Sequence, residues 1–293
     1  MLNPNEITIY AALAGAVLDV NTFDLGHGVA LSRKTLHVSA ESLLGLLPSI
    51  PEANHPALRA LARSGAGFDL FAQLSVPAEF RPERWLDRVN TVWWIVTLLR
   101  LRCTPEVRIP LLASEPWFPG EPSPAGVEYW PVEIEGRRLP LEPGASPRIG
   151  EEDLRWVEAH WFHSGRLVVR KPPFNRLLKC LDKAYIMTDP AVSLVSLWEG
   201  LERLLAPAGK LDRNVPEGVA AFLESPGEAR RKLGDRVGLL YEARALAEEG
   251  LEPPEGCLAE TYAIVKRVCL KIVEEERVPT REEIERGRFV GLN

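Results

Sequence analysis

The chain has few cysteines, a single glutamine and no apolar run of membrane-spanning length. Its four cysteines stand alone in the sequence, at Cys103, Cys180, Cys257 and Cys269. None belongs to a CxxC pair or has a histidine at ligand spacing, which argues against a zinc site and favours isolated buried thiols. The apolar stretch at residues 92–99 is far shorter than the roughly 20 residues that span a bilayer. We therefore expect no membrane segment, no metal site and no cofactor.

A signal peptide and a global basic charge are also missing. The first 25 residues lack the basic-then-apolar order of a secretory signal, so we expect a cytoplasmic protein. The net charge of −6 is shared equally by residues 1–150 and 151–293, so any nucleic-acid binding must come from a local basic patch. Gln73 is the only glutamine, arginine far outnumbers lysine and proline reaches 25 residues. Such usage is typical of thermophilic proteins.

The distribution of proline divides the chain into two parts. Prolines crowd residues 105–150, which excludes long helices and central strands there. Residues 1–150 therefore predict a mixed α/β domain, with strands near 7–10, 17–20, 29–31 and 127–134 and helices near 41–47, 56–64 and 83–101. Residues 151–293 instead follow a 3.6-residue apolar period, which predicts a nearly all-α domain with helices near 151–162, 174–187, 190–206, 216–224, 227–248, 257–276 and 280–288. The expected fold class is α+β.

Two of the expected C-terminal helices carry distinctive segments. The first, LWEGLERLL at residues 197–205, places leucines on one face with Trp198 beside them. The second, LLYEARALAEEG at residues 239–250, holds Arg244 inside its apolar repeat and ends at Gly250. Taken singly, both segments predict helices with a buried apolar face.

Taken together, the two segments resemble the Apea-like HEPN domain family, in which an LWxxLExLL helix is followed by an LYxxR helix that ends in His-Gly. The resemblance covers roughly residues 174–276 and is carried by Trp198, Glu202, Tyr241, Arg244 and Gly250. It implies a compact helical bundle, with Trp198 and Tyr241 packed inside, that forms a two-fold homodimer. It also implies a cleft between the subunits in which two Arg–His pairs cleave RNA without a metal.

The histidine of that motif is replaced in this chain. In the family's chemistry the histidine transfers a proton and the arginine stabilises charge on the phosphate. Arg244 is present, but Glu249 occupies the histidine position, and a carboxylate there repels the phosphate. Arg244 is then either a retained ligand contact or a partly buried cation paired with Glu202 or Glu248. The sequence Glu249-Gly250 is also typical of a helix C-terminus with glycine just beyond it.

Other histidines offer weaker candidate sites. His160 and His163 lie three residues apart on one expected helix, a spacing that suits a metal or a catalytic pair as well as a solvated or aromatic-packed helix end. No third ligand is evident, and no histidine follows His163. His27 lies in a glycine-flanked turn that lacks the strand–loop–helix context of a phosphate-binding loop.

Basic residues are dense in one segment, which contains Arg166, Arg170, Lys171, Arg176, Lys179 and Lys183. The last three recur at spacings of three and four on one helical face, with aromatic residues interleaved. This pattern is typical both of a surface that follows a phosphate backbone and of an ordinary solvated helix face. A second cluster at residues 230–236 is diluted by acidic neighbours.

The sequence leaves three functional hypotheses. The first is a catalytically silent HEPN-type protein, an RNA-associated or regulatory module in a prokaryotic RNA-linked or phage-defence, toxin–antitoxin-like pathway. Its binding residues would be Arg170, Lys171, Arg176, Lys179, Lys183 and Arg244. The second is an active metal-independent endoribonuclease with a site remodelled around Arg244, which uses His160 or His163. The third is an interaction module whose protein partner is encoded nearby.

Overall fold

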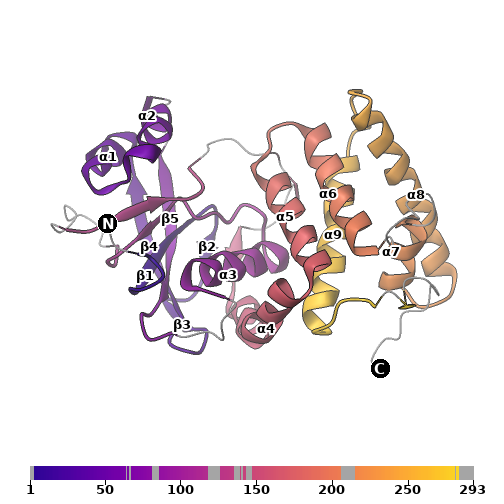
Figure 1. The fold of residues 1–293 in the computed structure, drawn as a ribbon, viewed down its shortest axis with the longest axis horizontal. Coiled ribbons are helices and arrows are strands. Elements are labelled where there is room, and N and C mark those ends of the chain that lie inside the picture. Colours follow the sequence, from indigo (N-terminus) through magenta and orange to yellow (C-terminus); the bar gives the residue numbers. More distant parts are fainter. Residues whose placement is uncertain are drawn as a thin grey trace. The chain divides into compact units, whose positions relative to one another are not determined.

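The structure is a computed structural model that describes residues 3–63, 65, 67–80, 86–117, 126–134, 139, 141–142, 147–205, 215–280 and 282–283. The chain divides into two compact units. The N-terminal unit comprises Met1–Gly136 and Ala145–Phe162, and the C-terminal unit comprises Arg137–Gly144 and His163–Asn293. The first contains the β-sheet and the second is helical, which confirms the expected α+β class (Figure 1). The sequence places the domain boundary at residue 150, and the compact units divide within the helix that begins there.

A six-stranded sheet in the order β3-β4-β5-β1-β6-β7 forms the frame of the N-terminal unit. Its strands, all antiparallel to their neighbours, are β1 (Ile9–Ala14), β3 (Thr22–Asp24), β4 (Ala30–Val38), β5 (Phe68–Val76), β6 (Leu111–Ala113) and β7 (Tyr129–Pro131). The register pairs Ala11 with Leu74 and Leu74 with Leu31, so the middle of the sheet is apolar. Separately, β2 (Val17–Leu18) pairs in parallel with β8 (Arg148–Ile149).

Two short helices, α1 (Ala40–Gly45) and α2 (His55–Arg63), cover one face of this sheet. Leu43 of α1 and Leu58 of α2 are fully buried in a cluster that includes Ala12 of β1. Because side chains alternate along a strand, the neighbours of Ala12 in β1 point to the opposite face, where they too are fully buried. The sheet is therefore covered on both faces.

The longer helix α3 (Arg88–Arg102) contacts β1 and β5 and is buried around most of its circumference. It contains a fully buried arginine, Arg100. The Nε of Arg100 donates to the carbonyl oxygen of Val107 at 2.7 Å, and its Nη2 donates to both carboxylate oxygens of Glu133 at 2.7 and 2.6 Å. These partners make the buried charge tolerable and tie α3 to the segment before β6 and to the residues after β7.

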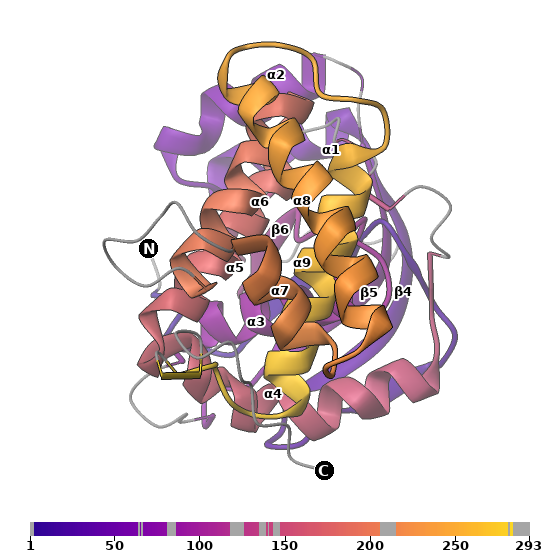
Figure 2. The ribbon, with the colours of Figure 1, turned by 90° about the vertical axis from the view of Figure 1, so that its right-hand side faces the viewer.

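The C-terminal unit is a bundle of helices. Their bounds are α4 (Glu151–Arg170, which begins in the N-terminal unit), α5 (Pro172–Ile186), α6 (Pro190–Leu205), α7 (Val215–Leu223), α8 (Glu228–Glu248) and α9 (Cys257–Glu274). α6 contacts α5, α7, α8 and α9 and is the central element. Figure 2 shows α8 in front of α9, with the connection between them crossing the end of the bundle. Leu194, Leu197 and Leu201 of α6 are fully buried among these partners.

The close approach of α5 and α6 depends on Gly200. A Cβ atom at this position would lie 2.7 Å from Cδ1 of Leu177 and 3.1 Å from Cβ of Cys180, both on α5. Any side chain would therefore push the two helices apart. The glycine inside LWEGLERLL is thus required by helix packing.

Most of the expected C-terminal helices are present within two or three residues of their predicted bounds, except that α4 extends to Arg170. Most of the helix expected at residues 280–288 lies outside the described residues. In the N-terminal unit β5 was not predicted from the sequence. Its segment FDLFAQLSV does alternate, with apolar residues at 68, 70, 72, 74 and 76 and polar ones at 69, 73 and 75, so the sequence carries this signal. Nearly all of these residues are buried because β5 lies between β4 and β1 with both faces covered. β4 also extends well beyond the predicted residues 29–31.

Candidate functional site

α6 and α8 bring the residues of the proposed family motif into one polar cluster. The Nη1 of Arg244 donates to Oε1 of Glu202 and, at 2.9 Å, to the hydroxyl oxygen of Tyr241. The Tyr241 hydroxyl in turn donates to the same Glu202 oxygen at 2.7 Å. The Nη2 of Arg244 donates to Oε1 of Glu248, one turn further along α8, at 2.8 Å. Both carboxylates that the sequence offered as partners of Arg244 therefore bind it.

Aromatic packing fixes this cluster against the core of the bundle. Trp198 is fully buried, as the sequence predicts, and its ring meets that of Tyr241 edge-on with centroids 5.0 Å apart. Tyr241 is half-buried, and the Arg244 guanidinium lies 5.2 Å from the centre of its ring. Burial, together with the hydrogen bond to Glu202, raises the pKa of the Tyr241 hydroxyl. Tyr241 therefore stays neutral, and its hydroxyl donates a hydrogen bond to Glu202.

The cluster is largely shielded from water and carries more negative than positive charge. The side chains of Arg244 and Glu202 are 19% and 11% exposed, whereas that of Glu248 is 44% exposed. One guanidinium thus faces two carboxylates in a region of low dielectric. A phosphate approaching Arg244 would have to displace a carboxylate from it and would be repelled by the other.

Glu249 is the C-cap residue of α8 and is exposed. The N–H of Gly250 donates to the carbonyl of Ala247 at 3.1 Å, and the N–H of Leu251 donates to the carbonyl of Leu246 at 2.9 Å. Gly250 has a φ of 77°, in the left-handed region. This is the Schellman arrangement, in which glycine ends a helix and satisfies its last carbonyl groups. Helix termination accounts for Glu-Glu-Gly at this point.

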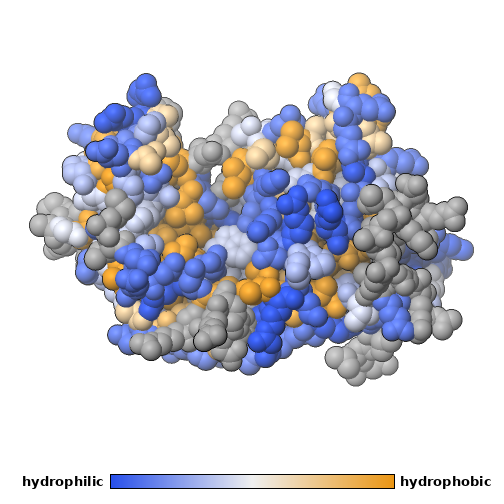
Figure 3. Space-filling view, in the orientation of Figure 1, coloured by the Kyte–Doolittle hydropathy of each residue, from blue (hydrophilic) through white to orange (hydrophobic). Residues whose placement is uncertain are grey.

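The basic residues of α5 are partly neutralised by a carboxylate on α6. Arg176 is hydrogen-bonded to Glu199. This contact is the main cause of a lowered pKa at Glu199, and the charges of Lys183 and Arg203 lower it further. Three cations therefore gather around one carboxylate, and exposed Lys179 continues the row on α5. Hydrophilic side chains gather over α5 and α6 in Figure 3.

Sequence reasoning did not include Glu199 and Arg203 in this surface. Both lie on α6, one turn apart, and only the packing of α6 against α5 places Glu199 beside Arg176. Arg170 and Lys171 are exposed where α4 meets α5. The second basic cluster is neutralised in part, since Lys232 pairs with Glu228 on its own helix and Arg236 pairs with a glutamate of α9.

Two of the three candidate histidines pack against aromatic rings, and the third is exposed. His160 donates from Nδ1 to the carbonyl oxygen of Trp156 at 2.7 Å, and its ring lies on that indole with centroids 4.6 Å apart. His163 is exposed. His27 stacks on Phe162 at a centroid distance of 4.0 Å and has a φ of 56° in its turn. Among the described residues, no group of three histidine, cysteine or acidic side chains could hold a metal ion.

No family model, curated protein or solved structure matches this chain. The resemblance to the HEPN family therefore rests on the residues of α6 and α8. In the part of the chain that the structure describes, no helix combines the length and the apolar character that a bilayer crossing requires.

Proposed function

We propose that the C-terminal unit is a catalytically silent HEPN-type module that associates with RNA, in keeping with a regulatory role in an RNA-linked or defence pathway. The observation that carries this proposal is the pairing of Arg244 with both Glu202 and Glu248. The arginine that would bind the scissile phosphate is instead held in ion pairs with two glutamates of the bundle.

Metal-independent RNA cleavage needs a group that exchanges protons near neutral pH beside a group that stabilises phosphate charge. Glu249 is an exposed carboxylate at the end of α8 and repels phosphate. Residues 164–293 contain no histidine that could replace it. We expect no cleavage of single-stranded RNA at pH 7, with or without magnesium, and no activity in Glu249→His, because Arg244 stays paired in that variant.

RNA association is supported by the cations of α5 and α6. Arg176, Lys179, Lys183 and Arg203 lie on these two helices, and Glu199 pairs with Arg176 among them. Such a surface follows a phosphate backbone without reading bases. Each neutralised phosphate of a single strand releases counterions and contributes about 0.7 to the slope of log affinity against log salt concentration.

Fluorescence anisotropy with a labelled single-stranded RNA tests the association. Lys179→Gln combined with Lys183→Gln should weaken binding roughly tenfold and reduce the salt slope by about 1.4, because two phosphate contacts are lost. The matched control combines Arg231→Gln with Lys232→Gln, which removes two cations from α8. Equal losses in both variants, or a salt-independent affinity, would contradict a specific basic surface. Any cleavage abolished by Arg244→Ala would contradict the silent site.

A further inference from the structure

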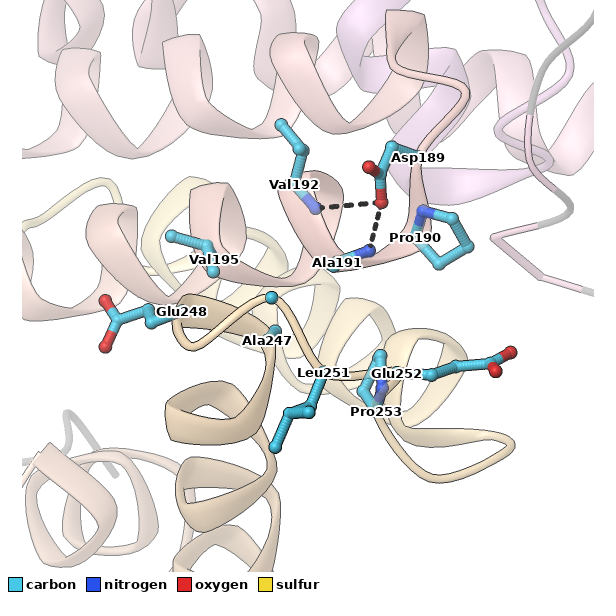
Figure 4. A pocket seen from close by; sticks show the side chains of 11 residues that line it. Asp189, Pro190, Ala191, Val192, Val195, Ala247, Glu248, Leu251, Glu252 and Pro253 are labelled. Atoms are coloured by element: carbon cyan, nitrogen blue, oxygen red, sulfur yellow. Dashed lines mark hydrogen bonds between the residues drawn. The ribbon is translucent and has the colours of Figure 1, made fainter.

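A groove opens at one end of the helical bundle, beyond the Arg244 cluster. It lies between the start of α6 and the connection from α8 to α9, and its volume is about 780 Å³. Figure 4 shows apolar side chains such as Val195, Ala247 and Pro253 in its middle, with the carboxylates of Glu248 and Glu252 toward its two ends. The volume is in the range of sites that hold several side chains of a ligand.

The groove leaves large apolar side chains in contact with water. Val192, in the first turn of α6, is 48% exposed, and Leu251, directly after α8, is 52% exposed. Leu251 is held in this position by the helix-terminating hydrogen bond from its N–H to Leu246. Figure 4 shows the two side chains pointing to opposite sides, so they offer apolar contacts at the edges of the groove. Exposed apolar groups at the edge of a concave surface are typical of a site that buries a partner's side chain.

The charge of the groove has one sign. Asp189, Glu248 and Glu252 line it, and no basic residue is among the lining residues, although Glu248 also pairs with Arg244 beside the groove. The partial negative charge at the C-terminus of α8 adds to this field. The N-terminus of α6 opposes it little, because the Asp189 carboxylate accepts hydrogen bonds from the N–H groups of Ala191 and Val192 at 2.8 and 3.4 Å. The groove therefore attracts cations and repels phosphates.

We infer that this groove docks a segment of a partner protein in which apolar side chains are flanked by lysine or arginine. The apolar middle takes the apolar side chains, and Glu248 and Glu252 contact the flanking cations. Charge complementarity decides against nucleic acid as the occupant. The inference does not depend on RNA association, since the groove and the basic surface of α5 involve different residues.

Binding of short synthetic peptides to the full-length protein tests this inference. The probe is a fluorescein-labelled peptide of twelve residues in which leucine and lysine alternate in pairs, so that the leucines share one helical face. Its counterparts carry glutamate in place of lysine, or serine in place of leucine. We expect anisotropy to report binding of the leucine–lysine peptide and no binding of either counterpart, because both apolar contact and positive charge are required.

Variants of the groove then locate the site. Val192→Ser should weaken peptide binding about fivefold through lost apolar contact, and Glu252→Lys about tenfold through reversed charge. The matched controls are Val169→Ser, at a valine that is 45% exposed on α4, and Glu217→Lys, at an exposed glutamate of α7; both should leave affinity unchanged. All four positions are at the surface, and circular dichroism checks the fold of each variant.

The possible outcomes are distinct. Losses confined to the two groove variants support the docking site, whether or not the α5 variants weaken RNA binding. Failure of the leucine–lysine peptide to bind at millimolar concentration overturns it. Equal binding of the serine counterpart also overturns it, as do equal losses in the groove and control variants. Either result would mean that the acidic surface attracts any cationic peptide, without a specific site. If RNA displaces the peptide from the groove, the groove does not repel phosphate, and this too would contradict the inference.

Discussion

Replacing Arg244 with methionine distinguishes a structural arginine from a ligand-binding one. Methionine retains much of the aliphatic stem that packs beside Tyr241 but removes the guanidinium. Glu202, which is 11% exposed, then keeps the Tyr241 hydroxyl as its partner and loses its counter-ion. Glu248 loses its partner as well, but it is 44% exposed and water can replace the arginine there.

The size of the effect follows from these differences in burial. Breaking one partner out of a buried ion pair costs about 3–5 kcal/mol, because the remaining charge stays desolvated. The remaining hydrogen bond to Glu202 and the 19% exposure of Arg244 place the cost for this pair at or below the lower end of that range. We expect Arg244→Met to lower the free energy of unfolding by about 2–3 kcal/mol.

Urea denaturation monitored by far-ultraviolet circular dichroism measures this change. Arg236→Met is the matched control, because Arg236 also pairs with a glutamate of a neighbouring helix, Glu260, while the two side chains are 50% and 46% exposed. Its expected cost is about 0–1 kcal/mol. In a double-mutant cycle, Arg244→Met and Glu202→Gln should be coupled by about 1–3 kcal/mol.

A neutral or stabilising effect of Arg244→Met would refute the structural reading. Residues retained for ligand binding commonly leave stability unchanged, or raise it, when they are replaced. Absence of coupling between Arg244 and Glu202 would equally show that their contact contributes nothing to the fold.

Three further predictions concern the core, the acid response and assembly. Trp198→Ala should destabilise the protein by about 3–5 kcal/mol in the same denaturation assay, because it empties a fully buried aromatic site, and a loss below about 1 kcal/mol would contradict that packing. Arg176 lowers the pKa of Glu199, so their pair stabilises the fold above the unfolded pKa of about 4.3, and this stabilisation is lost as the pH falls through the lower folded pKa. Glu199→Gln should therefore reduce the loss of unfolding free energy at acid pH, and an unchanged pH dependence would argue against the pair. We also expect a homodimer in light scattering, supported by exposed Leu239 and Leu246, seven residues apart on α8, and a monomer at tens of micromolar would refute it.

Much of the helical unit could be predicted from the sequence because its helices are amphipathic and their ends carry local signals. Gly250 marks the end of α8, and the apolar positions of α6 match its buried face. β5 carries a local signal too, because FDLFAQLSV alternates apolar and polar residues, but its strand partners could not be predicted from that pattern. Its place in the sheet depends on β4 and β1, which lie far from it in the sequence.

The sequence by itself determined that Glu249 stands where the motif it resembles has a histidine, and that no histidine follows His163. It also offered Glu202 or Glu248 as partners of Arg244, with a retained ligand contact as the alternative. Only the tertiary structure decided that both bind it, since one carboxylate lies a turn away on α8 and the other on α6. The same holds for Glu199 beside Arg176 and for the acidic groove beyond Glu248. The local sequence pattern determines which side chains lie on each face of a helix. Which charged side chains pair across two helices depends on how the helices pack, and that packing depends on contacts between residues distant in sequence.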